Sequence, residues 1–252
     1  MGKILIILCL VFFSTVGFSG NIDPKKTDAD YLSYGEKHKC VLKILGHYSG
    51  EKNIPYNASC VIIDPYHVLT AAHVVKNSIS QYIIYNNEAY DCIKMIIHPD
   101  FDSKKMGYND IAILKLSKPI EIDFYPDLYD KSDEFHKICS ISGFGLNGTL
   151  SNGYDIKKSD GKRRAGSNMV AEIDKDLLIC STKDRSTELE FLICPGDSGG
   201  GLFIDKKLAG INSCVIAADK KTDSNYGDES GHTRISSFIE WIENSKKQLN
   251  TD

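Results

Sequence analysis

The chain has 252 residues, of which 42% are hydrophobic and 25% are charged, and its formal net charge is −4. A chain of this size and composition can bury a large core, which excludes a mainly disordered protein and fits one large domain or two small ones. Acidic and basic residues are interspersed without a basic stripe, so we expect no nucleic-acid partner.

The first 20 residues have the outline of a secretory signal peptide. Lys3 is followed by the apolar run 4–13 and then by small or polar residues up to Gly20. This order disfavours the alternative, a buried N-terminal strand or helix, and the run is too short to span a bilayer. We expect cleavage between Gly17 and Gly20. The mature protein would be secreted, to the outside of the cell or into a bacterial periplasm, and would have no membrane-spanning segment.

Removal of this segment leaves seven of the eight cysteines, namely Cys40, Cys60, Cys92, Cys139, Cys180, Cys194 and Cys214. In an oxidising compartment we expect disulfide bonds among them, and the odd number leaves at least one thiol free or bonded to another chain. No Cys-x-x-Cys pair and no Cys/His cluster has zinc spacing, so we expect neither a metal nor another cofactor.

Ten short runs of β-forming residues are separated by Gly, Asn, Asp and Pro. They cover 40–44, 60–63, 67–70, 82–85, 93–97, 111–116, 138–142, 177–180, 201–204 and 208–211. Short strands at this spacing predict an all-β sandwich or barrel and disfavour alternating strands and helices. Only 235–245 has helical periodicity, through Ile235, Phe238, Ile239 and Ile242, and we expect it to pack on the body as a C-terminal helix.

Two polar segments interrupt these runs. Residues 117–134 contain two prolines and many acidic residues near the middle of the mature chain, which indicates a linker between two β domains. Residues 147–166 are rich in Gly, Asn, Lys and Arg, and we expect an exposed loop that proteases can cut.

Three strings carry a histidine, an aspartate and a serine, in that order: LTAAHVV at 69–75, YNDIAILKL at 108–116 and CPGDSGGGL at 194–202. Alone, His73 would be interpreted as a core or surface histidine, Asp110 as a turn residue and the glycine-rich string as a turn. Together they are the set that acyl transfer needs. A serine hydroxyl is a weak nucleophile, so a histidine must take its proton while a buried carboxylate fixes the histidine tautomer.

The glycines around Ser198 have a second use in this chemistry. They allow the backbone N–H groups of Gly196 and Ser198 to point at one position, where the oxyanion of a tetrahedral intermediate would lie. The candidate catalytic residues are therefore His73, Asp110 and Ser198, and the candidate oxyanion hole is formed by Gly196 and Ser198.

These strings resemble the chymotrypsin-like (trypsin-like) serine protease family. TAAH carries the histidine of that family, NDIAILKL its aspartate and GDSGG its serine, and the resemblance extends from about Cys40 to Lys247. It implies two six-stranded antiparallel β-barrels with the active site between them, to which the C-terminal helix is added. It also implies a secreted serine endopeptidase, monomeric, that forms an acyl-enzyme on protein or peptide substrates and that protein inhibitors could bind.

On this basis the chain divides into five parts. The signal peptide is 1–20, an N-terminal segment is 21–39, and the first barrel, with His73 and Asp110, is 40–120. The second barrel, with Ser198, is 121–234, and the C-terminal helix and tail are 235–252.

Two other functions fit part of the pattern. GDSGG also matches the nucleophile elbow of lipases and esterases, which Asp228 and His232 could complete in the required order, but that fold needs alternating strands and helices. The second alternative is a catalytically weak or inactive protease-like binding protein, although no member of the candidate triad is missing.

The sequence departs from the family pattern at its cysteines. Val74 stands where a cysteine usually follows the histidine, and Cys214 replaces a common tryptophan. Cys139, Cys180 and Cys194 fall at family positions, but their usual partners are missing or displaced. A bridge between Cys194 and Cys214 is conceivable because both segments flank one pocket, yet sequence alone does not fix the connectivity.

The resemblance also implies which residues contact the substrate. The pocket floor, six residues before the nucleophile, would be Leu192 with Ile193 beside it, so a substrate Arg or Lys would find no carboxylate. Small or medium aliphatic side chains are therefore expected just before the scissile bond, with an acidic residue as the alternative if His232 lines the pocket. The strand that pairs with the substrate backbone would be Ser213, Cys214 and Val215, and Val215 would narrow the pocket.

In the family, a new apolar N-terminus pairs with the aspartate that precedes the serine, here Asp197. No apolar start follows a basic residue between the signal peptide and Cys40. We therefore expect activity without such an N-terminus, and another partner for Asp197.

Overall fold

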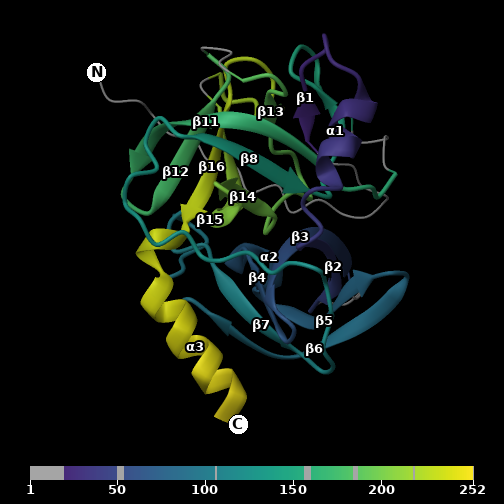
Figure 1. Cartoon of the computed structure of the whole chain (residues 1–252), viewed down its shortest axis with the longest axis vertical. Coiled ribbons are helices and arrows are strands. Elements are labelled where there is room, and N and C mark those ends of the chain that lie inside the picture. Colours follow the sequence, from purple (N-terminus) through teal and green to yellow (C-terminus); the bar gives the residue numbers. More distant parts are fainter. Residues whose placement is uncertain are drawn as a thin grey trace.

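Strands dominate the chain and close into two barrels of six strands each (Figure 1). The computed structural model describes residues 20–49, 54–105, 107–155, 160–183, 187–217 and 219–251. Residues 1–19, and with them nearly all of the predicted signal peptide, lie outside this part. The two antiparallel barrels and the C-terminal helix confirm the predicted fold class.

The first barrel uses the β-branched runs of the first half of the chain. Its strands are β2 (Val41–Tyr48), β3 (Ile54–Asp64), β4 (His67–Thr70), β5 (Ser78–Tyr85), β6 (Glu88–Ile97) and β7 (Ala112–Leu116), closed in the order β2-β3-β4-β7-β6-β5. Val61, Leu69 and Ile113 are partners across β3, β4 and β7, and all three are fully buried. Their side chains fill the barrel interior because alternate residues of a strand face the same side.

The second barrel contains two strands that the sequence does not predict. Its strands are β8 (Ile138–Gly143), β11 (Arg164–Asp174), β12 (Leu177–Ser181), β14 (Gly201–Ile204), β15 (Lys207–Ile216) and β16 (Glu229–Arg234), closed in the order β11-β12-β16-β15-β14-β8. The unpredicted strands, β11 and β16, read RAGSNMVAEID and ESGHTR and are rich in residues with low strand propensity. Pairing on both sides within the closed barrel stabilises them instead.

A small sheet of two-residue strands lies beside the second barrel. It has the order β10 (Gly153–Tyr154), β9 (Gly148–Thr149), β1 (Asn21–Ile22) and β13 (Phe191–Leu192). The prediction of an exposed loop over 147–166 is wrong for much of the described part, because β9, β10 and the start of β11 fall within it. Leu150 and Arg164 there are 0% and 1% exposed.

Helix α1 (Asp28–Gly35) is not predicted by hydrophobic periodicity, although a capping box marks its start. The side chain of Thr27 accepts a hydrogen bond from the backbone N–H of Asp30, and the Asp30 carboxylate accepts one from the backbone N–H of Thr27. The helix packs on β11, where the Arg164 guanidinium binds the Asp28 carboxylate with N–O distances of 2.6 and 2.8 Å. A segment that precedes the first barrel is thereby attached to the second.

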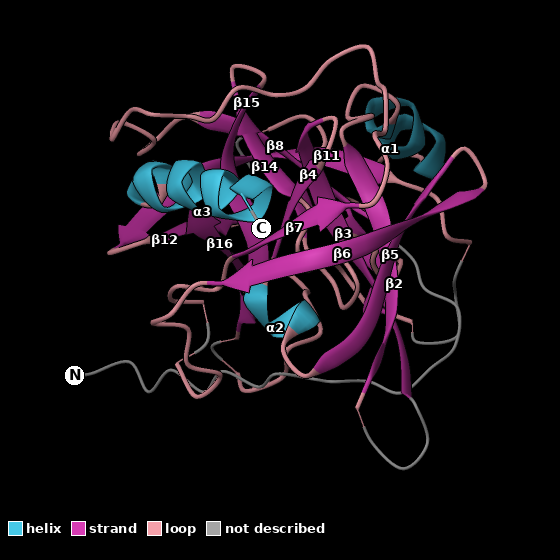
Figure 2. Cartoon of the chain, turned by 90° about the horizontal axis from the view of Figure 1, so that it is seen from below, coloured by secondary structure: helices cyan, strands magenta, loops and turns pink. Residues whose placement is uncertain are grey.

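The C-terminal helix makes the opposite connection. After the 3-10 turn η1 (Ile235–Ser237), α3 (Ile239–Thr251) leaves the second barrel and packs on β6 and β7 of the first. Lys115 Nζ donates to the carbonyl of Leu249 at 3.0 Å, and Lys246 Nζ lies 3.0 Å from Asp64 Oδ2. Figure 2 shows α1 and α3 on different sides of the strands. None of the described helices is long and apolar enough to cross a membrane.

The barrels are joined by a continuous apolar core. Phe203, Leu208 and Ile211, from β14 and β15 of the second barrel, belong to the same buried cluster as the interior of the first. This contact holds the loops that carry the candidate catalytic residues at one junction.

Candidate active site

His73 is positioned by the end of β4. After Thr70 the chain forms a one-turn helix, α2 (Ala72–Val75), which lies against the core through Ala72, Val74 and Val75. The His73 side chain is left 18% exposed at the surface of this turn. A buried support with one accessible imidazole edge suits a group that exchanges protons with a substrate.

Asp110 lies in the loop before β7 and is 2% exposed. Its Oδ1 accepts from the backbone N–H of His73 at 2.9 Å, and its Oδ2 lies 2.7 Å from His73 Nδ1. From the second barrel, Ser213 Oγ donates to the same Oδ2 at 2.6 Å, and Thr233 Oγ1 donates to the Asp110 carbonyl at 3.0 Å. Both barrels therefore fix the orientation of this carboxylate.

The two groups shift each other's protonation. Burial alone would lower the pKa of His73, but the Asp110 carboxylate outweighs burial and raises the pKa above 6.5. Burial would raise the pKa of Asp110, but the charge of His73 and the bonds from His73 and Ser213 lower it below 3.8. The pair favours a carboxylate beside an imidazole that readily becomes imidazolium.

Ser198 lies in the loop between β13 and β14, next to the segment that leads to His73. Its carbonyl accepts from the backbone N–H of Ser59 at 2.9 Å. Gly199 has φ +82°, and a Cβ there would lie 2.0 Å from Thr70 Oγ1 and 3.1 Å from the Ala71 nitrogen. Only glycine permits this approach. The loop thus lies against residues 70–71, although Ser198 Oγ forms no hydrogen bond to any other described residue, His73 included.

The direction of the Gly196 N–H follows from the carbonyl that shares its peptide plane. Pro195 O accepts from the Leu146 N–H at 2.7 Å, and no described peptide bond is cis. In a trans peptide the C=O and N–H point in opposite directions, so the Gly196 N–H points away from Leu146. Gly196 has φ +96°, a conformation natural to glycine.

The Ser198 N–H is directed in the same way. The Asp197 carbonyl accepts from the Gly200 N–H at 2.9 Å and from Asn212 Nδ2 at 3.1 Å. The Ser198 N–H therefore points to the opposite side of the peptide plane. Neither this N–H nor that of Gly196 donates to a described residue, and both are available to an oxyanion.

The Asp197 carboxylate is fully buried and accepts from backbone amides. Its Oδ1 binds the Gly145 N–H and its Oδ2 the Cys194 N–H, each at 2.8 Å. These bonds give the Asp197 carboxylate partners within the described chain, and they hold the loop that carries Ser198 against the loop that follows β8.

The residues expected to line the specificity pocket are apolar and buried. Leu192 is 0% and Ile193 2% exposed, and the Ile193 N–H donates to Ser230 Oγ at 3.1 Å. Val215, which is half-buried, is the cross-strand partner of Ser230. Ile193 and Val215 therefore both lie next to Ser230, whereas Leu192 of β13 pairs with Asn21 of β1.

The strand expected to contact the substrate backbone has one edge without a partner strand. Pairing of β15 with β14 ends at Ile211, whereas pairing with β16 continues to Ile216. Within the described residues, 213–216 are therefore paired on one side only. Cys214 in this stretch is 4% exposed, and the Ser213 hydroxyl donates its hydrogen bond to the Asp110 carboxylate.

His232 lies inside the second barrel and is 0% exposed. Its Nδ1 is 2.9 Å from Asn212 Oδ1, and burial lowers its pKa to about 3. A neutral, enclosed imidazole gives no support to an acidic substrate preference. It is also not bonded to Asp228, and the barrels exclude the sheet that a lipase elbow requires.

Three residues at the site are missed by the sequence analysis. Ser59, Asn212 and Thr233 each bond to a candidate catalytic segment from a distant strand. Ser59 Oγ donates to the Gly196 carbonyl and accepts from the Phe144 N–H, both at 2.9 Å. Their contacts to the candidate site join residues that are far apart in the sequence.

No disulfide bond joins any of the seven described cysteines, so the expected disulfide bonds are absent from the described residues, the considered pair Cys194 and Cys214 included. Cys139 Sγ and Cys180 Sγ, in the second barrel, lie 3.7 Å apart. Among the described residues, no cluster of three or more His, Cys, Asp or Glu could hold a metal ion.

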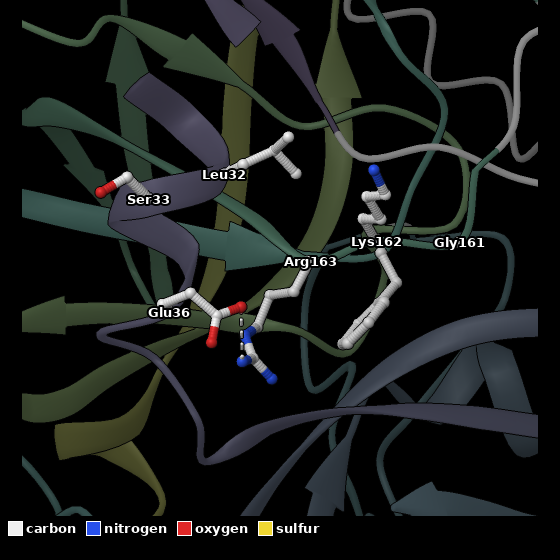
Figure 3. Close-up of a pocket in the computed structure, with 7 residues that line it drawn as sticks. Leu32, Ser33, Glu36, Gly161, Lys162 and Arg163 are labelled. Atoms are coloured by element: carbon white, nitrogen blue, oxygen red, sulfur yellow. Dashed lines mark ion pairs between the residues drawn. The ribbon is translucent and has the colours of Figure 1, made fainter. Parts of the chain in front are cut away.

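Two surface hollows are lined by none of the predicted site residues. One, of about 390 Å³, is drawn in Figure 3 and is lined by Leu32, Ser33, Glu36, Phe144, Gly161, Lys162 and Arg163. Arg163 lies there with its guanidinium 3.6 Å from the Glu36 carboxylate. The other, of about 640 Å³, contains His38 and Ser140.

Known proteins resemble this chain in sequence and in fold. The trypsin family model matches residues 44–242. Mast cell protease 3 of Ovis aries is 29% identical over 72% of this chain and 74% of its own length, and trypsin-3 of Salmo salar is 26% identical over 79% and 91%. The solved structure of HL collagenase has a TM-score of 0.69 at 18% identity and covers 92% of this chain and 97% of its own. Neuropsin, a serine protease of mouse brain, has a TM-score of 0.65 at 18% identity, over 84% and 96%.

The barrels, the junction loops and these relatives define a serine endopeptidase, a hydrolase that acts on protein or peptide substrates. The chain belongs to the trypsin family.

Proposed function

We propose that this chain is a secreted, monomeric serine endopeptidase in which His73, Asp110 and Ser198 form the catalytic triad. The observation that carries the proposal is the His73–Asp110 pair, with its 2.7 Å contact, beside a loop that leaves two backbone N–H groups free to bind an oxyanion. Secretion is supported by the order of charged, apolar and small residues at the start of the chain.

The chemistry begins with the orientation of His73. The Asp110 carboxylate can only accept, so the proton of a neutral His73 is held on Nδ1 and the lone pair of Nε2 is presented to the site. Ser198 Oγ attacks the substrate carbonyl carbon as its proton passes to Nε2. The imidazolium that forms is stabilised by Asp110, and the raised pKa of His73 reflects the same stabilisation.

The remaining steps use the same groups. The oxyanion accepts hydrogen bonds from the Gly196 and Ser198 N–H groups, and the peptide C–N bond breaks as His73 returns the proton to the leaving amine. Water then attacks the acyl-enzyme with His73 again as base. The product is a free carboxylic acid, and Ser198 regains its proton.

Specificity is proposed to follow from the pocket floor. A basic side chain would leave its charge unpaired against Leu192 and Ile193, which costs several kcal/mol, whereas Ala, Val or Leu would lose little. The one-sided pairing of 213–216 supports binding of the substrate backbone as an added strand.

A labelling experiment tests the triad. The purified protein, Ser198→Ala and Ser140→Ala are incubated with a fluorophosphonate probe. Ser140 is a matched control because its hydroxyl is partly buried and lies 2.8 Å from a histidine, His38 Nε2, outside the candidate site. We expect labelling that is lost only in Ser198→Ala. An unlabelled wild type would establish an inactive binding protein instead.

A peptide library tests specificity with the same protein. Cleavage after Ala, Val or Leu is the expected result. Efficient cleavage after Arg or Lys would overturn the pocket assignment and point to Asp228, which is 2% exposed, as the buried carboxyl to examine next.

A further inference from the structure

Two buried polar residues pair with each other across neighbouring strands, behind the loop that carries Ser198 between β13 and β14 (the nucleophile loop). Asn212 of β15 and His232 of β16 are cross-strand partners, and both are 0% exposed. Buried amides and imidazoles lose hydration, so they are retained at low cost only where their hydrogen bonds are well made. The hydrogen-bond partners of Asn212 and His232 therefore indicate what these two side chains do.

The Asn212 side chain holds two carbonyls. Its Nδ2 lies 3.1 Å from the Ser142 carbonyl of β8 and 3.1 Å from the Asp197 carbonyl of the nucleophile loop. Carbonyl oxygens only accept hydrogen bonds, so the NH2 end must face them. The amide oxygen, Oδ1, is therefore turned toward His232.

This orientation fixes the state of His232. Asn212 Oδ1 accepts from Nδ1 at 2.9 Å, so Nδ1 carries the ring proton. Burial lowers the pKa of His232 to about 3, and Nε2 has no hydrogen-bond partner among the described residues. The imidazole is thus a neutral donor with one tautomer, and its N–H keeps the Asn212 amide from rotating.

The Asp197 carbonyl shares its peptide plane with the Ser198 N–H. Because that plane is trans, the direction of the carbonyl sets the direction of the N–H. The carbonyl has a second donor, the Gly200 N–H at 2.9 Å, but that donor belongs to the same loop, three residues or fewer from the peptide that it would orient. Asn212 lies in β15, so its bond fixes the orientation of this peptide plane relative to the second barrel.

We propose that Asn212 and His232 are positioning residues that aim the Ser198 N–H at the oxyanion of the transition state. The proposal rests on the proposed function, because it needs acyl transfer at Ser198. Their bonds run from His232 Nδ1 to Asn212 Oδ1 and from Asn212 Nδ2 to the Asp197 carbonyl. Neither residue touches the substrate.

The test compares variants that keep or remove the donor. In Asn212→Leu both amide bonds are lost at similar volume, and in His232→Leu the ring donor is lost. In His232→Asn an amide nitrogen can occupy the place of Nδ1. His38→Leu is the matched control, since His38 is also buried and neutral, with a pKa lowered to about 4, but bonds Ser140 and the Tyr34 carbonyl.

Each variant is titrated for active sites with the fluorophosphonate probe, and kcat and KM are measured per titrated site on the best library peptide. The affinity of the matching peptide boronic acid is measured as well, because its tetrahedral adduct on Ser198 mimics the oxyanion. Loss of a whole oxyanion donor costs about 100- to 1,000-fold in kcat. Misdirection of one donor should cost less, about 10- to 100-fold in Asn212→Leu and about tenfold in His232→Leu.

The expected pattern is a fall in kcat with KM unchanged, a parallel loss of boronic acid affinity, and near-normal values in His232→Asn and His38→Leu. A merely structural role would lower the fraction of titratable sites and leave kcat per site and boronic acid affinity unchanged, which would overturn the proposal. If Asn212→Leu does not fold, the two His232 variants decide alone. An unlabelled, inactive wild type would instead refute the proposed function.

Discussion

Replacing Ser59 by alanine removes one hydroxyl that connects the first barrel to the nucleophile loop. Ser59 Oγ is bonded to the Gly196 carbonyl and to the Phe144 N–H, and the residue is 0% exposed. The backbone bond from the Ser59 N–H to Ser198 is untouched. The variant therefore deletes two hydrogen bonds without changing the path of the chain.

The magnitude follows from these two partners. A buried group left without its hydrogen bond costs about 1–3 kcal/mol, and partial access of water to the loop places each loss near the lower end. We expect the free energy of unfolding to fall by about 2–4 kcal/mol. Freeing the Gly196 carbonyl also loosens the peptide plane between the two oxyanion donors, so kcat should fall about tenfold with KM unchanged.

Urea denaturation measures the first effect, and kcat per titrated active site measures the second. Ser140→Ala is the control, since its hydroxyl makes one bond, to His38 Nε2 at 2.8 Å, and should cost about 1 kcal/mol without changing kcat. The reasoning is refuted if Ser59→Ala is no less stable than Ser140→Ala and retains full kcat.

Two further predictions concern ionisation. kcat/KM should rise with pH through the raised pKa of His73, with a midpoint above 6.5, because protonated His73 cannot act as a base. Asp110→Asn should move this midpoint to lower pH and lower kcat by about 10,000-fold. Profiles of kcat and of kcat/KM against pH for the wild type and the variant measure both effects. Burial and nearby carboxylates raise the pKa of Asp228 from 3.8 to about 6. The folded protein therefore binds this proton more tightly than the unfolded chain does, and the free energy of unfolding falls as pH rises from 3.8 to about 6. Asp228→Asn keeps an acceptor for the Ser224 N–H, and it should raise the free energy of unfolding by about 1 kcal/mol at pH 7 relative to pH 4. Urea denaturation at the two pH values measures this gain, and an equal gain in the exposed Asp130→Asn, which is not among the carboxylates that act on Asp228, would contradict the cause.

Strands whose own residues favour extended structure are predictable from sequence. The runs 67–70 and 201–204 are strands with the predicted bounds, since apolar and β-branched residues fill them. β11 and β16 depend on barrel closure, which no local window contains. Helix α1 lacks an apolar stripe, but Thr27 and Asp30 could have predicted its start.

The candidate catalytic residues are predictable for a different reason. His73, Asp110 and Ser198 lie in strings whose composition serves the chemistry directly. Ser59 and Gly196 are 137 residues apart, so nothing near Ser59 indicates its contact. For His232, sequence does not determine which way a residue of an unpredicted strand faces, and the structure places it inside the barrel.

The positions of α1 and α3 also determine what a single cut in the backbone would do. A break within 117–137 yields one fragment with α1 and the first barrel and another with the second barrel and α3. Each fragment carries a terminal segment that packs on the other, α1 on β11 and α3 on β6 and β7. His73 and Asp110 would belong to one fragment and Ser198 and Ser213 to the other. We therefore expect the two fragments of the nicked molecule to stay associated through these contacts, and the candidate site to be complete only while they are associated.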